Sequence, residues 1–234
     1  MKELFSKIST LIYSDEKDRY SRILKKYLNY FRNLMFKGNS CFNYNGNLLH
    51  YFFHPYNSTF ENERAIEIPI LKYYIKKHET GRILEVGNVT QFYFDFFHDI
   101  VDQYEIYKGV INEDIIKFAP KQKYDFVFSI STIEHVGWDY GKKDPKKIIA
   151  AVKKLKSITK KGGEIVITIP LGFSDFADKL VKSDVFDECF VLKRINLGND
   201  WVQVDSSILH KKVGFTYGHP FKGANWMVIG VINK

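Results

Sequence analysis

Cysteine is scarce in this chain. Only two occur in 234 residues, Cys41 and Cys189, and their separation matches neither a metal-binding motif nor a disulfide framework. The sequence therefore predicts no disulfide-stabilised fold and no metal site. Because disulfide-poor proteins are typical of reducing compartments, a cytoplasmic location is the expectation.

Long apolar runs are also absent. No stretch approaches the ~18–20 residues that a bilayer-spanning helix needs, and charged side chains interrupt the first twenty residues. We therefore predict no transmembrane segment, secretory signal or membrane anchor. Hydrophobic residues make up 45% of the chain and charged residues 26%, which is typical of a soluble globular protein of one large domain, with or without an extension.

Acidic residues are outnumbered. The chain has 35 Lys and Arg against 27 Asp and Glu, a net charge of +8, which would suit an anionic partner such as nucleic acid, a phosphorylated substrate or a membrane surface. The joint abundance of Lys, Ile, Asn, Tyr and Phe is typical of AT-rich coding. This compositional bias is the favoured explanation, and a nucleic-acid surface is the alternative.

Apolar residues recur at helical spacing through the first forty positions, with basic residues between them. We predict a helical extension over residues 1–45, followed by the main domain over residues 46–234. Such a helix would pack on the domain or on a second subunit, which makes a homo-oligomer one expectation. The alternative is a helix that lies on a membrane surface and holds the protein peripherally there.

From residue 82 the chain alternates short apolar strands with helical or polar segments. Helices are predicted over residues 61–77 and 144–163, the second with Asp144 as its N-cap and Pro145 in its first turn. Strands are predicted at 82–86, 98–102, 108–112, 124–130, 164–169, 188–196 and 225–232. This alternation indicates an α/β fold with a mostly parallel sheet covered on both faces.

Polar residues follow the early strands. In an open parallel sheet, ligands bind beyond the carboxyl ends of the strands. After the first strand, Gly87 would let the backbone approach a ligand closely. After the second, Asp102 could accept hydrogen bonds from both hydroxyls of a ribose, and after the third, Asp114 could accept from an adenine amino group.

These segments resemble the class I S-adenosylmethionine-dependent methyltransferases over residues 82–234. The resemblance is carried by "ILEVGN", "VINEDI", "YDFVFSISTIEHVG", "KKLKSITKKGGEIVITIP" and "ANWMVIGVI". With "YNSTFENERAIEIPI" upstream, the chain is also similar to methyltransferases associated with polysaccharide biosynthesis. The resemblance implies a Rossmann-like, seven-stranded, mostly parallel sheet with a reversed C-terminal hairpin, and S-adenosyl-L-methionine as the cofactor.

The resemblance also implies roles for individual residues. Glu85 and Gly87 would surround the amino-acid end of the cofactor, and Asn88 would offer it a side-chain amide. Asp102 would bind the ribose, with Glu105 as a competitor for that role. The remaining cofactor positions would be Asp114 at the adenine amino group, Ile115 as its apolar neighbour, and Ser129 after the fourth strand.

The first loop departs from the family pattern. Val89 and Gln91 stand where the second and third glycines are usual. A pyrophosphate needs several approaching amides in a tight glycine turn, so the loop argues against a dinucleotide. The carboxylate and ammonium of methionine need fewer contacts. The aromatic run "QFYFDFF", residues 91–97, is expected to pack under the site.

Residues after the fourth strand are candidates for methyl transfer. His135 and Glu134 would supply acid–base chemistry, because a hydroxyl acceptor must lose a proton. The alternative is that these residues serve helix packing or cofactor contacts. The segment "HPYNSTFENER", residues 54–64, is either an acceptor-binding lid or an ordinary helix start. The acceptor candidates are Tyr56, Asn57, Glu63, Arg64 and Asp139.

The sequence thus predicts a methyltransferase, with O-methylation of a sugar or glycan precursor as the favoured reaction. The position after the fourth strand reads "SIST" and lacks both the Pro-Pro motif of nucleobase amino methylation and a nucleophilic cysteine. RNA or protein methylation is one alternative, motivated by the positive charge. A catalytically inactive scaffold is another, motivated by the missing glycines.

Overall fold

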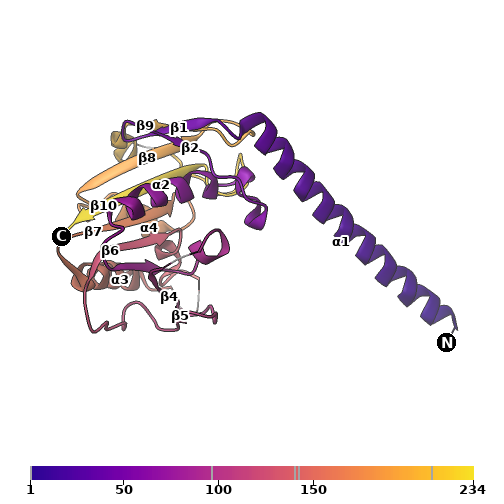
Figure 1. Cartoon of the computed structure of the whole chain (residues 1–234), viewed down its shortest axis with the longest axis horizontal. Coiled ribbons are helices and arrows are strands. Elements are labelled where there is room, and N and C mark those ends of the chain that lie inside the picture. The colour runs from indigo at the N-terminus through magenta and orange to yellow at the C-terminus, as the bar shows by residue number, and fades with distance from the viewer. Residues whose placement is uncertain (1, 96, 140, 142, 212) are drawn as a thin grey trace.

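The computed structural model describes residues 2–95, 97–139, 141, 143–211 and 213–234, with side chains described from residue 19 onward. Its centre is an eight-stranded sheet with the strand order β5-β4-β3-β6-β7-β10-β8-β9 (Figure 1). Helices cover both faces of this sheet, and one long helix extends away from the body. The architecture is the expected Rossmann-like α/β fold.

The first five strands of the sheet are parallel and the last three are antiparallel to their neighbours. The parallel strands are β3 (Ile83–Val86), β4 (Asp99–Val101), β5 (Val110–Ile111), β6 (Tyr124–Ile130) and β7 (Thr159–Pro170). The others are β8 (Glu188–Arg194), β9 (Trp201–Val204) and β10 (Trp226–Asn233). Because β10 lies between β7 and β8 and runs against both, the predicted reversed hairpin is confirmed.

The eighth strand, β9, was not predicted. Its four residues pair with β8 at the sheet edge, in a segment that the sequence favours as a loop. Trp201 at its start is buried and its indole N–H donates to Asn199 Oδ1 at 2.8 Å. The tryptophan therefore fills the core and does not face a ligand.

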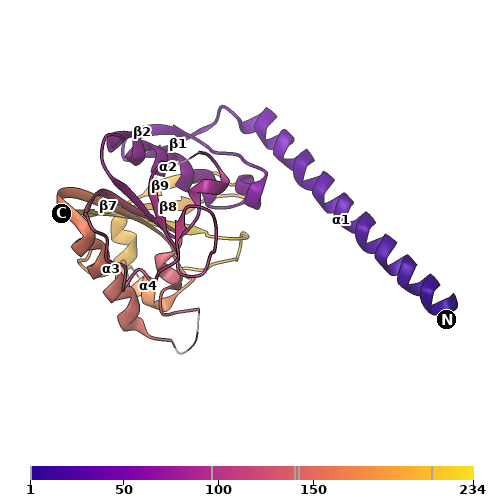
Figure 2. The same ribbon diagram turned by 60° about the horizontal axis from the view of Figure 1, so that its bottom comes forward.

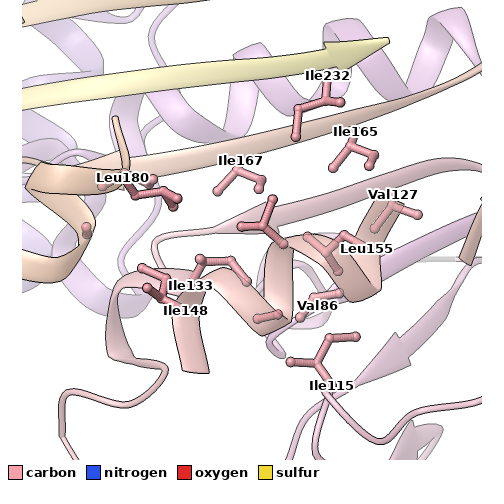
Figure 3. Packing of buried hydrophobic residues seen from close by; sticks show 14 of the residues in the cluster. Val86, Ile115, Val127, Ile133, Ile148, Leu155, Ile165, Ile167, Leu180 and Ile232 are labelled. Atoms are coloured by element: carbon pink, nitrogen blue, oxygen red, sulfur yellow. The ribbon is translucent and has the colours of Figure 1, made fainter. Parts of the chain in front are cut away.

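Side chains on the two faces of the sheet form two cores. Ile165 and Ile167 of β7 face α3 (Pro145–Ile158) and α4 (Asp175–Leu180), where Leu155 and Leu180 meet them (Figure 3). Val166, between them in sequence, faces the opposite core under α2 (Arg64–Lys77). This alternation is the period of two that a strand imposes, and it leaves every β7 residue from Ile165 to Pro170 buried.

Helix α3 begins as predicted and ends early. The Asp144 side chain accepts a hydrogen bond from the Lys146 backbone N–H at 3.0 Å, which caps the first turn. The helix was expected to reach residue 163, but it ends at Ile158 and β7 starts at Thr159. Gly162, with φ of +79°, belongs to a bulge in this strand instead of a helix cap.

Helix α2 contains a proline that links it to the preceding segment. Pro69 has no N–H to donate to the carbonyl of Ala65 four residues earlier. That carbonyl instead accepts a hydrogen bond from Phe52 N at 2.9 Å. The proline thereby ties the chain before α2 to the helix surface, close to the start of the segment that was predicted to bind an acceptor.

A short hairpin precedes this region. It consists of β1 (Cys41–Tyr44) and β2 (Asn47–His50), joined by Asn45 and Gly46, both with positive φ. The sequence predicted the turn and missed the strands. Tyr44 is fully buried, and its hydroxyl lies 2.8 Å from that of Tyr74 on α2. The predicted domain boundary at residue 45 falls in this turn.

Residues 2–37 form one helix, α1 (Lys2–Lys37), which projects from the body as a straight rod (Figures 1 and 2). At its C-terminal end, the Lys37 ammonium donates to the Gly198 carbonyl at 2.6 Å and pairs with Asp200. The short 3-10 helices are η1 (Tyr56–Glu61), η2 (Thr90–Phe92), η3 (Ile133–His135) and η4 (Ser206–His210). Within the described ranges, no helix has the length and apolarity to cross a membrane.

Gly230 in the middle of β10 provides a test of this packing. A Cβ at this position would lie 2.4 Å from the Phe186 ring. We expect Gly230→Ala to lower the free energy of unfolding by about 1–3 kcal/mol, because the ring must shift in a packed core. Urea denaturation measures the change. The control is Gly214→Ala, where a Cβ meets nothing within 4 Å, and equal midpoints for the two variants would contradict the packing described.

Candidate active site

A cavity of about 430 Å³ opens at the carboxyl ends of β3, β4 and β6, where an open parallel sheet binds its ligands. Its size is within the range of small-molecule and cofactor sites. Most of the predicted site residues line it: Tyr56, Asn57, Arg64, Gly87, Asn88, Asp102, Asp114, Ile115, His135 and Asp139. The topology thus brings together residues that are up to 83 positions apart, from Tyr56 to Asp139.

Four predicted residues do not line this cavity. They are Glu63, Glu85, Ser129 and Glu134, all buried. The Ser129 hydroxyl donates to the Val86 carbonyl at 2.9 Å, which ties β6 to β3. Glu63 Oε2 accepts from Ala224 N at 3.0 Å, which ties the start of α2 to the start of β10. These two residues hold the walls of the site together.

Glu85 organises the loop after β3 from below. One carboxylate oxygen accepts hydrogen bonds from the backbone N–H groups of Val89 and Thr90, both at 2.9 Å. The other accepts from the Thr90 hydroxyl and lies 2.9 Å from His98 Nε2. The loop amides are therefore satisfied by a carboxylate, which explains how this loop keeps a defined path without the second and third glycines.

Gly87 is required at its position for two reasons. Its φ of +89° is in the left-handed region, which L side chains rarely adopt. A Cβ here would also lie 2.2 Å from Thr132 Oγ1, on the loop after β6. The backbone of Gly87 is anchored by a hydrogen bond from its N–H to the Val101 carbonyl at 2.9 Å. The bare backbone at this point faces the cavity.

Asn88 joins the first loop to the second. Its backbone N–H donates to Asp102 Oδ2 at 3.1 Å, and its side-chain N–H donates to Glu105 Oε2 at 2.8 Å. Its amide oxygen Oδ1 is buried and has no hydrogen-bond partner among the described residues. A buried acceptor without a partner costs free energy. At a cavity wall, a ligand's N–H or O–H would satisfy it.

Asp102 and Glu105, both in the loop after β4, have different hydrogen-bond partners. Asp102 Oδ1 accepts from the backbone N–H groups of Tyr104 and Glu105, both at 2.8 Å, and its other oxygen holds Asn88. Asp102 is therefore occupied in shaping its own loop. Glu105 also lines the cavity, and among the described residues its carboxylate accepts from the Asn88 amide, so it is the better placed of the two to accept from a ribose diol.

Asp114 and Ile115 form the far end of the cavity. Asp114 Oδ1 accepts from Ile116 N at 2.9 Å, which fixes the turn that follows β5. Ile115 is 7% exposed and belongs to the core under α3 (Figure 3). A carboxylate beside an apolar surface is the arrangement that an adenine ring with an amino group would fit.

His135 and Asp139 form a hydrogen-bonded pair at the cavity wall. His135 Nδ1 contacts Asp139 Oδ2, one helical turn apart, and the imidazole packs on the Phe173 ring at a centroid distance of 4.6 Å. A proton on Nδ1 shared with this carboxylate leaves Nε2 as the free acceptor. Glu134 Oε1 is 3.8 Å from Nε2, which is beyond hydrogen-bond distance.

Glu134 belongs to a buried acidic cluster behind the cavity, together with Glu63 and Glu67. Burial raises the pKa of the Glu134 carboxyl well above its ordinary value, and the neighbouring charges of Glu67 and Glu63 raise it further. Its Oε2 has no partner within the described part of the chain. Burial and these neighbouring charges therefore favour the protonated form of the Glu134 carboxyl. His135, next to it in sequence, is the exposed member of the predicted pair.

Arg64 connects this cluster to the cavity. Its guanidinium pairs with Glu67, whose other oxygen accepts from the hydroxyls of Ser131 at 2.6 Å and Thr168 at 2.5 Å. Burial lowers the pKa of Arg64, but the charges of Glu67 and Glu63 outweigh burial and raise it. A permanently charged guanidinium is therefore held at the cavity wall by a buried carboxylate.

Sequence reasoning missed several residues that line the cavity, among them Phe92, Tyr93, Glu113, Thr132 and Lys147. The aromatic run was expected to pack under the site, and two of its members instead form a wall. Tyr56 of η1 stacks on Phe92 of η2, with ring centroids 4.7 Å apart. Phe96 of the same run lies outside the described residues. The aromatic density was the signal available in the sequence.

Metal binding has no visible basis in the described residues: they contain no group of three or more His, Cys, Asp or Glu side chains that could hold an ion. Three further aromatic residues, Trp201, Tyr217 and Trp226, do not line the cavity.

The raised pKa of Glu134 has a consequence for stability. Because the folded state binds this proton more tightly than the unfolded chain, stability falls as pH rises through the interval between the two pKa values. Glu134→Gln removes this titration. We expect the stability of the variant, compared with that of the parent protein at the same pH, to be more favourable at about pH 8 than at about pH 5. The gain in free energy of unfolding is at most about 1.4 kcal/mol for each pH unit that separates the unfolded and folded pKa values of Glu134. Thermal melts of parent and variant at both pH values measure this change, with Glu79→Gln at an exposed position as the control. A stability difference between parent and variant that is the same at both pH values would contradict a raised pKa for Glu134.

No protein-family model and no curated protein matches this chain. Among solved structures, it is similar to a SAM-dependent methyltransferase from Archaeoglobus fulgidus, with 15% identity, 76% of this chain and 98% of the other covered, and a TM-score of 0.47. It is similar to the PH0226 protein from Pyrococcus horikoshii, with 18% identity, coverages of 77% and 91%, and a TM-score of 0.42. A third is the N-methyltransferase NodS from Bradyrhizobium japonicum in complex with S-adenosyl-L-homocysteine, with 8% identity, coverages of 74% and 91%, and a TM-score of 0.40. At these values the likeness carries no argument about function, which depends on the geometry of the site.

Proposed function

We propose that this protein is an S-adenosylmethionine-dependent methyltransferase that methylates a hydroxyl group of a sugar or glycan precursor. The observation that carries the proposal is the cavity at the carboxyl edge of the sheet. It combines cofactor-type contacts along β3, β4 and β5 with a histidine–aspartate pair after β6. A binding module without chemistry would have no need for the second feature.

The residues present fit the cofactor. The bare backbone at Gly87 and the unpartnered Asn88 oxygen suit the polar amino-acid end. Glu105 would accept from the ribose hydroxyls, and Asp114 beside Ile115 would hold the adenine. The missing glycines do not argue for an inactive scaffold, because the Glu85 carboxylate fixes the path of the loop by accepting from the backbone N–H groups of Val89 and Thr90.

The cofactor would supply a methyl group already activated on a sulfonium, so the tasks left to the protein are alignment and proton removal. Asp139 accepts from His135 Nδ1, which orients the ring and leaves Nε2 to take the proton of an acceptor hydroxyl. An unprotonated amine already has a free lone pair for the methyl group. The paired base therefore favours a hydroxyl acceptor.

The acceptor would lie between η1 and the His135 loop. Tyr56 offers an aromatic face that Phe92 supports, and Asn57 and Arg64 offer donors to a hydroxyl-rich molecule. Asn57 has a positive φ of +53°, which turns the η1 backbone sharply at this wall. These features are the basis for a sugar-like acceptor.

The charge around the cavity disfavours an RNA acceptor. The charged residues that line the cavity are Asp102, Glu105, Glu113, Asp114 and Asp139 on the acidic side, and Arg64 and Lys147 on the basic side. A polyanion would be repelled by this excess of carboxylates. The net positive charge of the chain therefore has its origin elsewhere than at the proposed site.

Glu105 is the residue whose removal should most directly weaken cofactor binding. Glu105→Gln replaces a carboxylate that would accept from the ribose, and we expect the dissociation constant for S-adenosylmethionine to rise about tenfold, because a hydrogen bond to a charged group is worth about 1.5–3 kcal/mol. Isothermal titration calorimetry measures it. Glu79→Gln, an equal charge change on an exposed residue, should bind normally. No binding by the parent protein at millimolar cofactor would refute the proposed function.

His135 is the residue whose removal should most affect the transfer step. His135→Asn should reduce kcat by about 10²–10⁴, as expected for loss of a general base, with a smaller loss for Asp139→Asn, and with unchanged cofactor affinity. The assay is release of S-adenosylhomocysteine with a panel of sugars. The control is His210→Asn, which changes an exposed histidine in η4. Full activity in His135→Asn would exclude the residue as the base.

A further inference from the structure

The second half of α1 has an amphipathic surface that the methyl-transfer site does not explain. In residues 19–37 the large apolar side chains fall on one arc of roughly half the helix circumference, at about 100° per residue. The residues on this apolar face are Tyr20, Ile23, Leu24, Tyr27, Leu28, Tyr30, Phe31, Leu34 and Met35. Phe36 is the exception and falls on the opposite side.

The apolar face is open to solvent. Tyr20, Leu24, Leu28, Phe31 and Met35, a strip at spacings of three and four, are between 57% and 78% exposed. Figures 1 and 2 show why: α1 leaves the body and meets it only at its C-terminal end. Exposed contiguous apolar surface of this kind marks an interaction site in a protein that is otherwise well packed.

All the charged residues of the opposite arc of the helix are basic. This arc has the residues Arg19, Arg22, Lys25, Lys26, Arg32 and Lys37, and no Asp or Glu occurs anywhere from residue 19 to residue 37. Lys37, the last residue of the helix, pairs with Asp200, and the other five basic residues precede it in α1. This segment therefore combines a broad apolar face with a cationic face.

We propose that residues 19–37 of α1 bind the surface of an anionic lipid bilayer. The apolar face would enter the boundary between headgroups and acyl chains, and the flanking lysines and arginines would contact anionic headgroups. Charge complementarity selects this partner. If two copies of residues 19–37 packed their apolar faces together, parallel or antiparallel, the basic residues beside each apolar face would lie next to those of the other copy and repel them. A nucleic acid would use the basic face and leave the apolar face in water.

Membrane binding through this face would also bring the cavity close to the lipid surface. The Tyr30 ring lies 6.4 Å from the Phe60 ring of η1, and η1 contributes Tyr56 and Asn57 to the cavity wall. Lys26 is close enough to His54 to help burial lower the pKa of that imidazole. The bound helix would thus hold η1, and the cavity wall it forms, next to the lipid surface.

Vesicle co-sedimentation of the full chain tests the proposal. The probes are vesicles of about 30% phosphatidylglycerol in phosphatidylcholine, and vesicles of phosphatidylcholine alone. We expect binding to the anionic vesicles, at least about tenfold weaker binding to the neutral ones, and a loss of binding at high salt. Lys25→Gln with Arg32→Gln should weaken binding about thirtyfold, since each basic residue near the surface contributes on the order of 1 kcal/mol and the two add to about 2 kcal/mol.

Matched variants separate the proposal from general charge attraction. Lys146→Gln with Lys153→Gln removes the same charge from exposed positions on α3 and should bind normally. Leu24→Ser with Leu28→Ser keeps the charge, removes apolar surface and should bind at least about tenfold more weakly; circular dichroism checks that its helix content and melting temperature are retained.

Three results would overturn the proposal. The first is an equal loss of binding in the α3 control, and the second is unchanged binding of the Leu24 and Leu28 variant to anionic vesicles. The third is association of the chain with itself, or with polyuridylic acid, in place of vesicles. Analytical ultracentrifugation detects self-association, and its loss in the Leu24 and Leu28 variant would assign the apolar face to a second copy.

Discussion

The buried carboxylate of Glu85 is the interaction on which the site depends. It sits at the end of the first strand of the parallel sheet and holds the backbone of the next turn through Val89, Thr90 and His98. With the loop held from below, Gly87 presents bare backbone to the cavity and Asn88 reaches across to the loop after β4. A charge inside a protein must be paired or hydrogen-bonded. Here that requirement gives a glycine-poor loop one defined path.

A second set of buried acids shapes the other side of the cavity. Glu67 holds Arg64 at the wall, while burial and its acidic neighbours raise the pKa of the Glu134 carboxyl. The acidic residues of this cluster therefore do different work from His135 and Asp139, which face the cavity and form the pair suited to proton transfer. The separation of these roles follows from position, because Glu134 is buried behind the cavity whereas His135 and Asp139 line it.

Positive and negative charge are segregated along the chain. Most of the charged residues that line the cavity are carboxylates, whereas residues 19–37 of α1 have six basic residues and no acidic residue. A net charge of +8 thus conceals two surfaces of opposite character. The two surfaces meet at η1, which contacts α1 through Phe60 and lines the cavity through Tyr56. Any acceptor that reached the cavity from the helix side would pass this segment.

The reversed order at the C-terminal end was an implication of the family resemblance, whereas the sequence pattern by itself determined the strand series and most of the residues that meet at the cavity. It could do so because alternation and strand-end position are local properties, and parallel strands place their carboxyl ends at one edge. It did not reveal β9 or the β1–β2 hairpin, whose four-residue strands have too little periodicity to detect. Only the tertiary structure decided that Asp102 accepts from the backbone of its own loop while Glu105 is held by Asn88, and that Glu134 is buried while His135 lines the cavity. Neighbouring residues differ in these ways because side-chain direction depends on the backbone turn and on packing against distant segments, neither of which a local pattern contains.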